Sequence, residues 1–180
     1  MALAAERTAP RLTLDDLATE SVSALAGRYA GGTVPTDLRT LDGRPTGRML
    51  AVRGADRGPL FGALRRFAGG AAFPWEGKSL HAADARFGAG INRVRLGGRH
   101  QLFAFRTSFE PSLLDGAPCI RLDYDLAENP GLIRKIHDEI REVAPGLYLG
   151  PAMWKGATGA ALVLWFGLDL EAQCAAPTWP

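Results

Sequence analysis

The chain has 180 residues, and its 21 basic and 19 acidic side chains leave a formal charge of +2. Hydrophobic residues make up 47% and charged residues 22%, an ordinary globular composition that excludes a disordered or low-complexity chain. No run of about 18 apolar residues occurs, so we expect no transmembrane helix and no stable membrane insertion. The first residues lack the pattern of a signal peptide, and the cytoplasm is the expected location.

The length suits one domain with a single core. We predict that domain over residues 12–172, between a flexible N-terminal tail of residues 1–11 and a C-terminal tail of residues 173–180. The net charge is too small to indicate a nucleic-acid partner, so none is expected. The sequence does not indicate an oligomeric state.

Two helices are predicted ahead of the sheet. The first has Thr13 as its N-cap and carries apolar residues at helical spacing up to Gly31. The second is predicted over residues 57–70, because a proline stands in its first turn and glycines end it. Between them we expect one helical turn around residues 37–41 and a short strand at residues 49–52.

From residue 75 onward the pattern alternates, which predicts an antiparallel meander. Gly97-Gly98 has the composition of a two-residue hairpin turn and would set Asn92 opposite Phe103. Asp115-Gly116 marks a second turn, which would set Phe109 opposite Leu122. The outer face of the first hairpin then collects Arg93, Arg95, His100 and Arg106. Both turns predict the same inner face, which holds Asn92, Val94, Phe103, Phe105 and Phe109.

Asn129-Pro130 is expected to open a helix over residues 131–143, with its charged residues in solvent. Closing strands are predicted at residues 147–154 and 160–168. Both faces of the last strand are apolar, so it is either covered on both sides or lines a cavity. These elements predict an α+β fold, in which an antiparallel β-barrel or strongly bent β-sheet of about seven strands carries two N-terminal helices and one inserted helix.

The run Trp75-Glu76-Gly77-Lys78 stands at the head of the meander and is followed by glycine-rich turns and the inward aromatic residues. In these features residues 75–168 resemble the lipocalin-like, or calycin, group of small-ligand barrels. The signature of that group is Gly-x-Trp, whereas this chain has Trp-x-Gly. The resemblance implies an apolar small molecule held inside the barrel.

No motif for a metal, a nucleophile or a phosphate occurs. His81, His100 and His137 lack metal-ligand spacing, so we predict no metal and no cofactor. Cys119 and Cys174 fit structural thiols, because neither has a CxxC partner or a positioned base. The basic face of the first hairpin is interpreted as a solvated sheet face, since no aromatic residues interleave with its arginines.

Asn92 is the informative inward residue, because a buried amide costs free energy unless it finds a partner. That partner is either a neighbouring backbone group or a ligand. Lys78 and Tyr124 would add polar points to an aromatic-walled pocket of the kind that small molecules use. The candidate ligand-binding residues are Trp75, Lys78, Asn92, Phe103, Phe105, Tyr124, Trp154 and Trp165.

The leading interpretation is a protein that binds an apolar small molecule, such as a lipid, an isoprenoid or a polyketide-like compound. The first alternative is a cofactor-independent isomerase or cyclase in the same cavity, which a perturbed pKa at Lys78 or Tyr124 would favour. The second alternative is a protein-interaction module, which a filled barrel interior and a large exposed apolar patch would favour.

Overall fold

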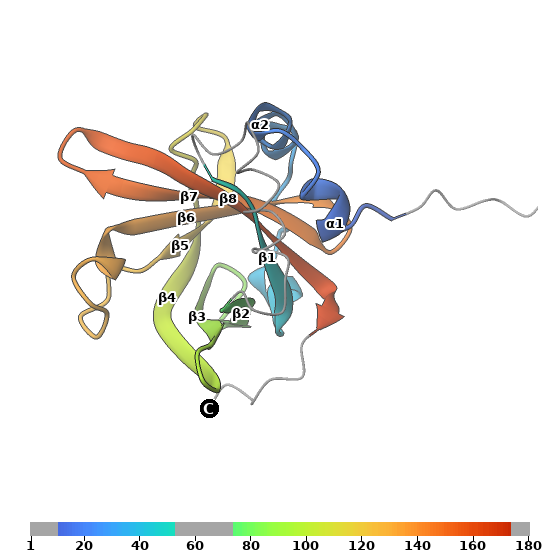
Figure 1. Ribbon diagram of the computed structural model, residues 1–180. Coiled ribbons are helices and arrows are strands. Elements are labelled where there is room, and N and C mark those ends of the chain that lie inside the picture. The colour runs from blue at the N-terminus through green and yellow to red at the C-terminus, as the bar shows by residue number, and fades with distance from the viewer. Residues whose placement is uncertain (1–10, 53–73, 174–180) are drawn as a thin grey trace, which may run out of the picture.

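A computed structural model of the chain describes residues 11–52 and 74–173. Within these residues eight antiparallel strands pair in chain order, and β1 also pairs with β8, so that the sheet closes into a barrel (Figure 1). The strands are β1 (Pro45–Val52), β2 (Trp75–Ala82), β3 (Phe87–Arg95), β4 (Arg99–Pro111), β5 (Pro118–Asp123), β6 (Ile136–Ala144), β7 (Leu147–Gly156) and β8 (Gly159–Gln173). The helices are α1 (Leu14–Leu17), α2 (Val22–Ala30) and the short 3-10 helices η1 (Leu38–Leu41) and η2 (Ile133–Lys135).

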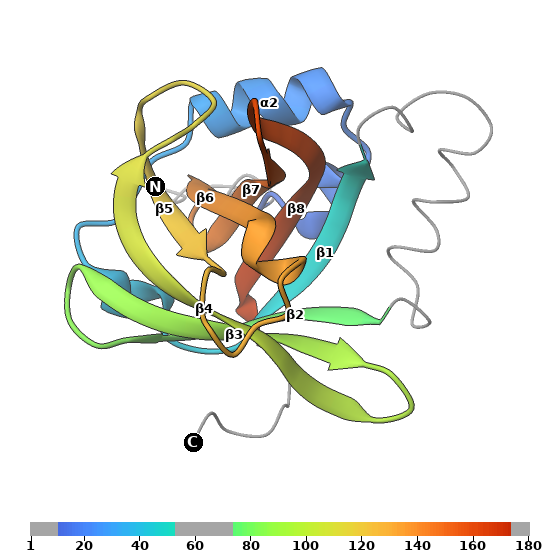
Figure 2. The same cartoon turned by 90° about the vertical axis from the view of Figure 1, so that its left-hand side faces the viewer.

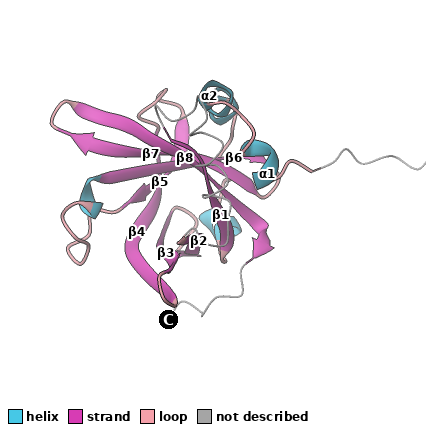
Figure 3. Cartoon of the chain, viewed as in Figure 1, coloured by secondary structure: helices cyan, strands magenta, loops and turns pink. Residues whose placement is uncertain are grey.

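The predicted barrel is confirmed, with eight strands rather than about seven. Figure 3 shows that strands dominate the described chain, so the fold is mainly β rather than α+β. None of the described helices is long and apolar enough to cross a membrane.

The predicted second helix, residues 57–70, lies outside the described residues, as do residues 1–10 and 174–180 of the predicted tails. At the inner ends of those tails the ordered structure extends further than expected. Arg11 donates hydrogen bonds of 3.1 and 2.7 Å to the carboxylate of Asp169, and β8 continues to Gln173.

The first predicted helix is divided into two. Thr13 caps α1 as expected and forms a capping box with Asp16. Helix α1 ends at Leu17. Ser21 caps the next helix, α2, by accepting a hydrogen bond from the amide of Ala24 at 3.2 Å. Both helices lie outside the barrel, α1 against β1 and β8 and α2 against β6 and β7 (Figure 2).

The first hairpin has a longer loop than predicted. Arg95 pairs with Arg99, and Asn92 therefore lies opposite Leu102 rather than Phe103. Phe103 is then an extra residue in a β-bulge, with a φ of 61° that is unusual for a residue other than glycine. The predicted register is wrong by one residue between the turn and the bulge, and it is correct beyond the bulge, where Ile91 pairs with Ala104. Phe103 lines the cavity, so the predicted inner face is retained.

The second hairpin also has a longer loop, in which the amide of Ser112 donates to the carbonyl of Ala117 at 2.9 Å. Phe109 consequently pairs with Ile120 rather than Leu122. The predicted register is wrong by two residues, and the faces are correct because side chains of a strand alternate with a period of two.

The predicted helix over residues 131–143 is wrong. Only η2 is helical there, and β6 follows it between β5 and β7. Ile136 and Ile140 suggested a helix because they are four residues apart, but that spacing places them on one face of a strand as well. Asp138, Glu139 and Arg141 of β6 are buried rather than solvated, because other segments supply their partners.

Apolar residues pack in two layers, one inside the barrel and one between the barrel and helices α1 and α2. In β8, Phe166 belongs to the inner layer and Trp165 to the outer layer. This arrangement explains why both faces of the last strand are apolar. Leu38 and Leu41 of η1 pack inside the barrel with Leu80, at the end opposite the β7–β8 hairpin.

Candidate functional site

A cavity of about 330 Å³ lies inside the barrel, toward the end that carries the β7–β8 hairpin, which projects to the left in Figure 1. Side chains from every strand except β5, from η2 and from Tyr124 directly after β5 form its wall. Its lining is mainly apolar and consists of Met49, Trp75, Lys78, Asn92, Val94, Phe103, Tyr124, Ile133, Ile136, Asp138, Ala152, Leu164 and Phe166.

Four polar residues, which we call the polar quartet, meet in the wall of this cavity: Lys78, Asn92, Tyr124 and Asp138. Each is at most 8% exposed. The Nζ of Lys78 donates to Asn92 Oδ1 at 2.9 Å, to the Tyr124 hydroxyl at 2.5 Å and to Asp138 Oδ2 at 3.1 Å. The three protons of the ammonium group are therefore all used.

The side-chain amide of Asn92 holds the quartet in place. Its Oδ1 accepts from Lys78 and from Trp75 Nε1, the latter at 3.0 Å. Its Nδ2 donates to the Tyr124 hydroxyl and to the carbonyl of Phe103, both at 3.1 Å. The protein itself supplies the partners of this amide, and Asn92 fixes both the lysine and the bulge at Phe103.

Asp138 is the member of the quartet that the sequence interpretation missed. Its Oδ2 accepts from Lys78 and from the Tyr124 hydroxyl, the latter at 3.1 Å. Its Oδ1 is buried and has no hydrogen-bond partner among the described residues. The Lys78–Asp138 ion pair makes the quartet neutral overall when both groups are charged.

Aromatic rings surround the ammonium group of Lys78. Its Nζ lies 5.0 to 5.4 Å from the ring centroids of Trp75, Phe105, Tyr124 and Phe166. Phe105 is fully buried, and its ring packs over Gly90, its partner in β3, where any Cβ would overlap the ring. These ring faces stabilise a cation at this position.

Burial shifts the pKa values of two members of the quartet. It lowers the pKa of Lys78 below its usual value of 10.5, and the charge of Asp138 opposes that shift only in part. It raises the pKa of Tyr124 well above 10, and the nearby carboxylate of Asp138 acts in the same direction.

The structure brings together most of the predicted site residues. Trp75, Lys78, Asn92, Phe103 and Tyr124 line the cavity, and Phe105 packs directly behind Lys78. Val94, predicted on the inner face, also lines the cavity, and the apolar lining residues that were not predicted are Met49, Ile133, Ile136, Ala152, Leu164 and Phe166.

Two predicted wall residues lie elsewhere. Trp154 is 36% exposed on the outside of β7, with the Nζ of Lys135 5.9 Å from its ring. Trp165 is buried on the outer side of β8, 5.5 Å from the ring of Tyr29. Both placements correct the prediction, because alternation along β7 and β8 directs these side chains away from the interior.

The histidines are separated from one another. Among the described residues no group of three potential ligands is placed to hold a metal ion. His81 lies 3.8 Å from Asp42, and His100 contacts the carbonyl of Leu96 at 3.0 Å. Cys119 is buried, as predicted, and desolvation raises the pKa of its thiol to about 12.

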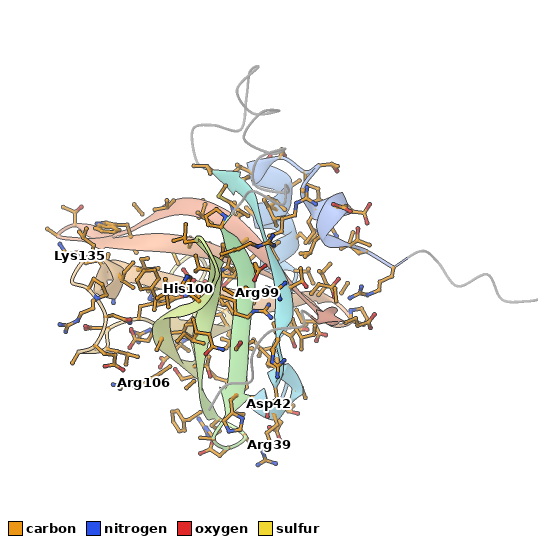
Figure 4. All side chains as sticks on the ribbon, turned by 60° about the horizontal axis from the view of Figure 1, so that its bottom comes forward. Arg39, Asp42, Arg99, His100, Arg106 and Lys135 are labelled. Atoms are coloured by element: carbon orange, nitrogen blue, oxygen red, sulfur yellow. The ribbon has the colours of Figure 1, made fainter. Side chains whose placement is uncertain are left out.

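The basic face of the first hairpin is only partly in solvent. Arg93 is buried and donates to the carbonyl of Pro45 at 2.5 Å, beside the single pair that joins β1 to β2. Arg95 forms an ion pair with Glu76 at 2.6 Å. Figure 4 shows Arg99, His100 and Arg106 on the outside of the barrel.

A second buried polar group, which we call the outer cluster, lies on the opposite side of β6 beneath α2. Its centre is Glu139, which is fully buried. The carboxylate accepts from Tyr29, Ser112 and the amide of Leu113 at 2.7, 2.5 and 2.7 Å, and it contacts His137 Nε2 at 2.9 Å. Ser112 and His137 both contact Glu139, so the arrangement does not form a nucleophile–base–acid chain.

Comparisons with protein-family models, with curated proteins and with solved structures yield no match. The lipocalin-like resemblance therefore stays a prediction, and the functional argument rests on the geometry of the cavity and the polar quartet.

Proposed function

We propose that the barrel binds a compact, electrically neutral and largely apolar small molecule in the cavity beside the polar quartet. The observation that carries this proposal is a cavity with mainly apolar walls and one localised polar group. Apolar walls supply affinity by desolvation, and a few placed polar groups orient the ligand.

The size of the cavity narrows the ligand class. A volume of about 330 Å³ is at the lower end of the range of about 300–1,000 Å³ for small-molecule sites. It therefore suits an isoprenoid-sized or bicyclic compound better than a long acyl chain.

The charge of the quartet narrows the class further. Lys78 and Asp138 neutralise each other, and every hydrogen-bond group of Asn92 is already used. A ligand carboxylate would have to compete with Asp138 for Lys78 and would leave two buried negative charges together, which is costly. A neutral carbonyl, ether or hydroxyl group avoids that cost.

The proposal is tested with N-phenyl-1-naphthylamine, a neutral probe whose fluorescence rises in apolar surroundings. We expect saturable binding of one probe per chain. Ala152→Phe places a ring in the cavity and is expected to abolish that binding. Val163→Phe adds the same ring on the exposed side of β8 and serves as the matched control.

Equal binding by the two phenylalanine variants would contradict the proposal, because the probe would then lie outside the cavity. Native mass spectrometry of the purified chain adds an independent reading. A retained apolar compound that is released by denaturant and is missing from Ala152→Phe would identify the ligand class directly.

A second candidate function is a cofactor-independent isomerase or cyclase that uses the same cavity. The shifted pKa values of Lys78 and Tyr124 favour it, because perturbed groups beside a cavity are a frequent property of acid–base sites. The protein-interaction alternative has less support, since its condition was a filled interior and the barrel holds a cavity.

The enzymatic candidate is tested with 2-tetralone, a neutral apolar ketone with exchangeable protons beside its carbonyl. In D₂O we expect the wild-type chain to accelerate hydrogen–deuterium exchange at the carbons next to the carbonyl, as followed by NMR. We expect Tyr124→Phe to lose most of this acceleration. Exchange no faster than in buffer, with 2-tetralone shown to displace the naphthylamine probe, would leave binding as the function.

A further inference from the structure

The cationic residue inside the barrel is a lysine, although the chain almost always uses arginine. Of the 21 basic residues only Lys78, Lys135 and Lys155 are lysines. Lys135 is exposed and the side chain of Lys155 is one-third exposed, whereas Lys78 is buried in the cavity wall. An arginine stays protonated under all ordinary conditions, while a lysine can lose its proton and react as a nucleophilic amine.

The surroundings of Nζ suit a cation that is attached to a ligand. Asp138 provides a counterion at 3.1 Å, and four aromatic rings face the nitrogen. These groups stabilise a positively charged nitrogen whether it is an ammonium group or a protonated imine.

We propose that Lys78 forms an imine with the aldehyde or ketone group of a compact apolar carbonyl compound bound in the cavity. This inference rests on the proposed function and names the ligand's reactive group.

The chemistry balances with groups that are present. The neutral amine of Lys78 attacks the carbonyl carbon, so that a C–N bond forms and the C–O π bond breaks. The nitrogen loses one proton to Asp138 Oδ2, which passes it to the oxygen and gives a hydroxyl group. This hydroxyl group takes a second proton from the Tyr124 hydroxyl, which regains it from solvent, and leaves as water while the nitrogen lone pair forms the C=N bond. The products are the protonated imine, which keeps one N–H beside the Asp138 carboxylate, and one water molecule.

The lowered pKa of Lys78 supports this reaction, because the neutral amine is more abundant near pH 7 than on an exposed lysine. The titratable groups that face Nζ are Asp138 from β6 and Tyr124, which directly follows β5. The protonated imine has one N–H, which Asp138 can accept, so the counterion keeps its function in the product.

The test uses the full chain, 1-naphthaldehyde as the carbonyl probe and cyanoborohydride to trap the imine as a stable amine. Intact mass and peptide mapping then report which lysine carries the naphthylmethyl group. We expect modification at Lys78 at least about tenfold faster than at Lys135 or Lys155 at pH 7, because the cavity holds the aldehyde beside the Lys78 amine. Lys78→Arg is expected to lose the modification, while Lys155→Arg keeps it.

The hydrocarbon 1-methylnaphthalene separates failure of this inference from failure of the proposed function. If it displaces N-phenyl-1-naphthylamine while 1-naphthaldehyde modifies only Lys135 and Lys155, the cavity binds apolar compounds and the imine inference is overturned. If N-phenyl-1-naphthylamine itself does not bind and 1-naphthaldehyde does not modify Lys78, both proposals fail. Mapping on the wild-type chain decides the matter even where a Lys78 variant does not fold.

Discussion

Two neighbouring carboxylates of β6, Asp138 and Glu139, enter different surroundings because successive side chains of a strand point to opposite faces. Asp138 joins the polar quartet inside the barrel, and Glu139 is the centre of the outer cluster beneath α2. Both are buried and both accept hydrogen bonds from a tyrosine and from other polar groups.

The two groups differ in what adjoins them. Glu139 uses both oxygens and is not among the residues that line the barrel cavity, and the nearby Arg141 is paired with Asp115 at 2.6 Å. Asp138 lines the cavity, and its Oδ1 has no hydrogen-bond partner in the described part of the chain. In the outer cluster both carboxylate oxygens of Glu139 are used, and this network holds α2 and the β4–β5 loop against the barrel. The polar quartet keeps one oxygen, unpaired within the described residues, beside the cavity, which suits it to binding a ligand.

The largest effect is expected when the outer cluster loses its acceptor. Glu139→Leu leaves three hydrogen-bond donors and the ring of His137 unpaired, and each costs about 1–3 kcal/mol when buried, so we expect a loss of at least about 3 kcal/mol in the free energy of unfolding. Urea denaturation measures it.

Glu139→Gln retains two polar side-chain atoms at this position, so its free energy of unfolding is expected to fall less than that of Glu139→Leu. Probe binding by the folded fraction of either variant should match the wild type, because Glu139 faces away from the cavity. A loss below about 1 kcal/mol in the free energy of unfolding of Glu139→Leu would mean that the outer cluster does not stabilise the packing of α2 on the barrel.

The next effect depends on pH and concerns the ion pair of the quartet. The pKa of Lys78 is lower in the folded chain than in the unfolded chain, so between the two values the unfolded chain binds more protons and the unfolding free energy rises with pH. The double variant Lys78→Met/Asp138→Leu removes both charges. Relative to it, we expect the wild type to gain up to about 1.4 kcal/mol per pH unit as the pH passes through that window toward 10.

Denaturation at several pH values from 7 to 9 measures this difference, since Tyr124, with its raised pKa, is present in both chains. At pH 7 the double variant should be at least as stable as the wild type, because apolar replacement of a buried ion pair is often neutral or stabilising. A difference that stays constant over the range would show that Lys78 does not titrate there.

Much of the inner face followed from the sequence. Alternation on either side of Gly97-Gly98 directed Asn92 and Phe103 inward, and this held even though the loop is longer and a bulge intervenes. A turn dipeptide indicates where a chain reverses, but the number of loop residues depends on backbone hydrogen bonds that the dipeptide does not specify.

The error at β6 concealed half of the ion pair. Residues 133–143, in which six charged residues alternate with isoleucines and a valine, have the pattern of a surface helix. Local propensity cannot reveal that Lys78, 60 residues away from Asp138, neutralises it. In a strand, Asp138 shares a face with Ile136 and Ile140. A strand prediction would therefore have identified Asp138 as an inward residue and a candidate partner of Lys78. Burial of charge is decided by partners that are distant in sequence.

A smaller effect is expected from removing the tyrosine hydroxyl of either the polar quartet or the outer cluster. Tyr124→Phe and Tyr29→Phe each remove one hydroxyl that donates to a buried carboxylate, at 3.1 and 2.7 Å. Each is expected to cost about 1–2 kcal/mol in the free energy of unfolding. Only Tyr124→Phe should change the affinity for N-phenyl-1-naphthylamine, because only Tyr124 lines the cavity. A change of affinity in Tyr29→Phe of the same size would show that the two sides of β6 are coupled.

The smallest expected effect is on the alkylation rate of Cys119, which is buried in β5 near Glu139. In a Cys174→Ser background, alkylation by iodoacetamide at pH 8 should require opening of the structure, since a thiol pKa of about 12 leaves almost no thiolate. Saturation with a cavity ligand slows this reaction only if the region around Cys119 opens together with the barrel. An unchanged rate would show local opening beneath α2, and rapid alkylation of the unliganded Cys174→Ser chain would contradict the burial of the Cys119 thiol. Because β6 carries both groups, we expect the ligand to slow the reaction.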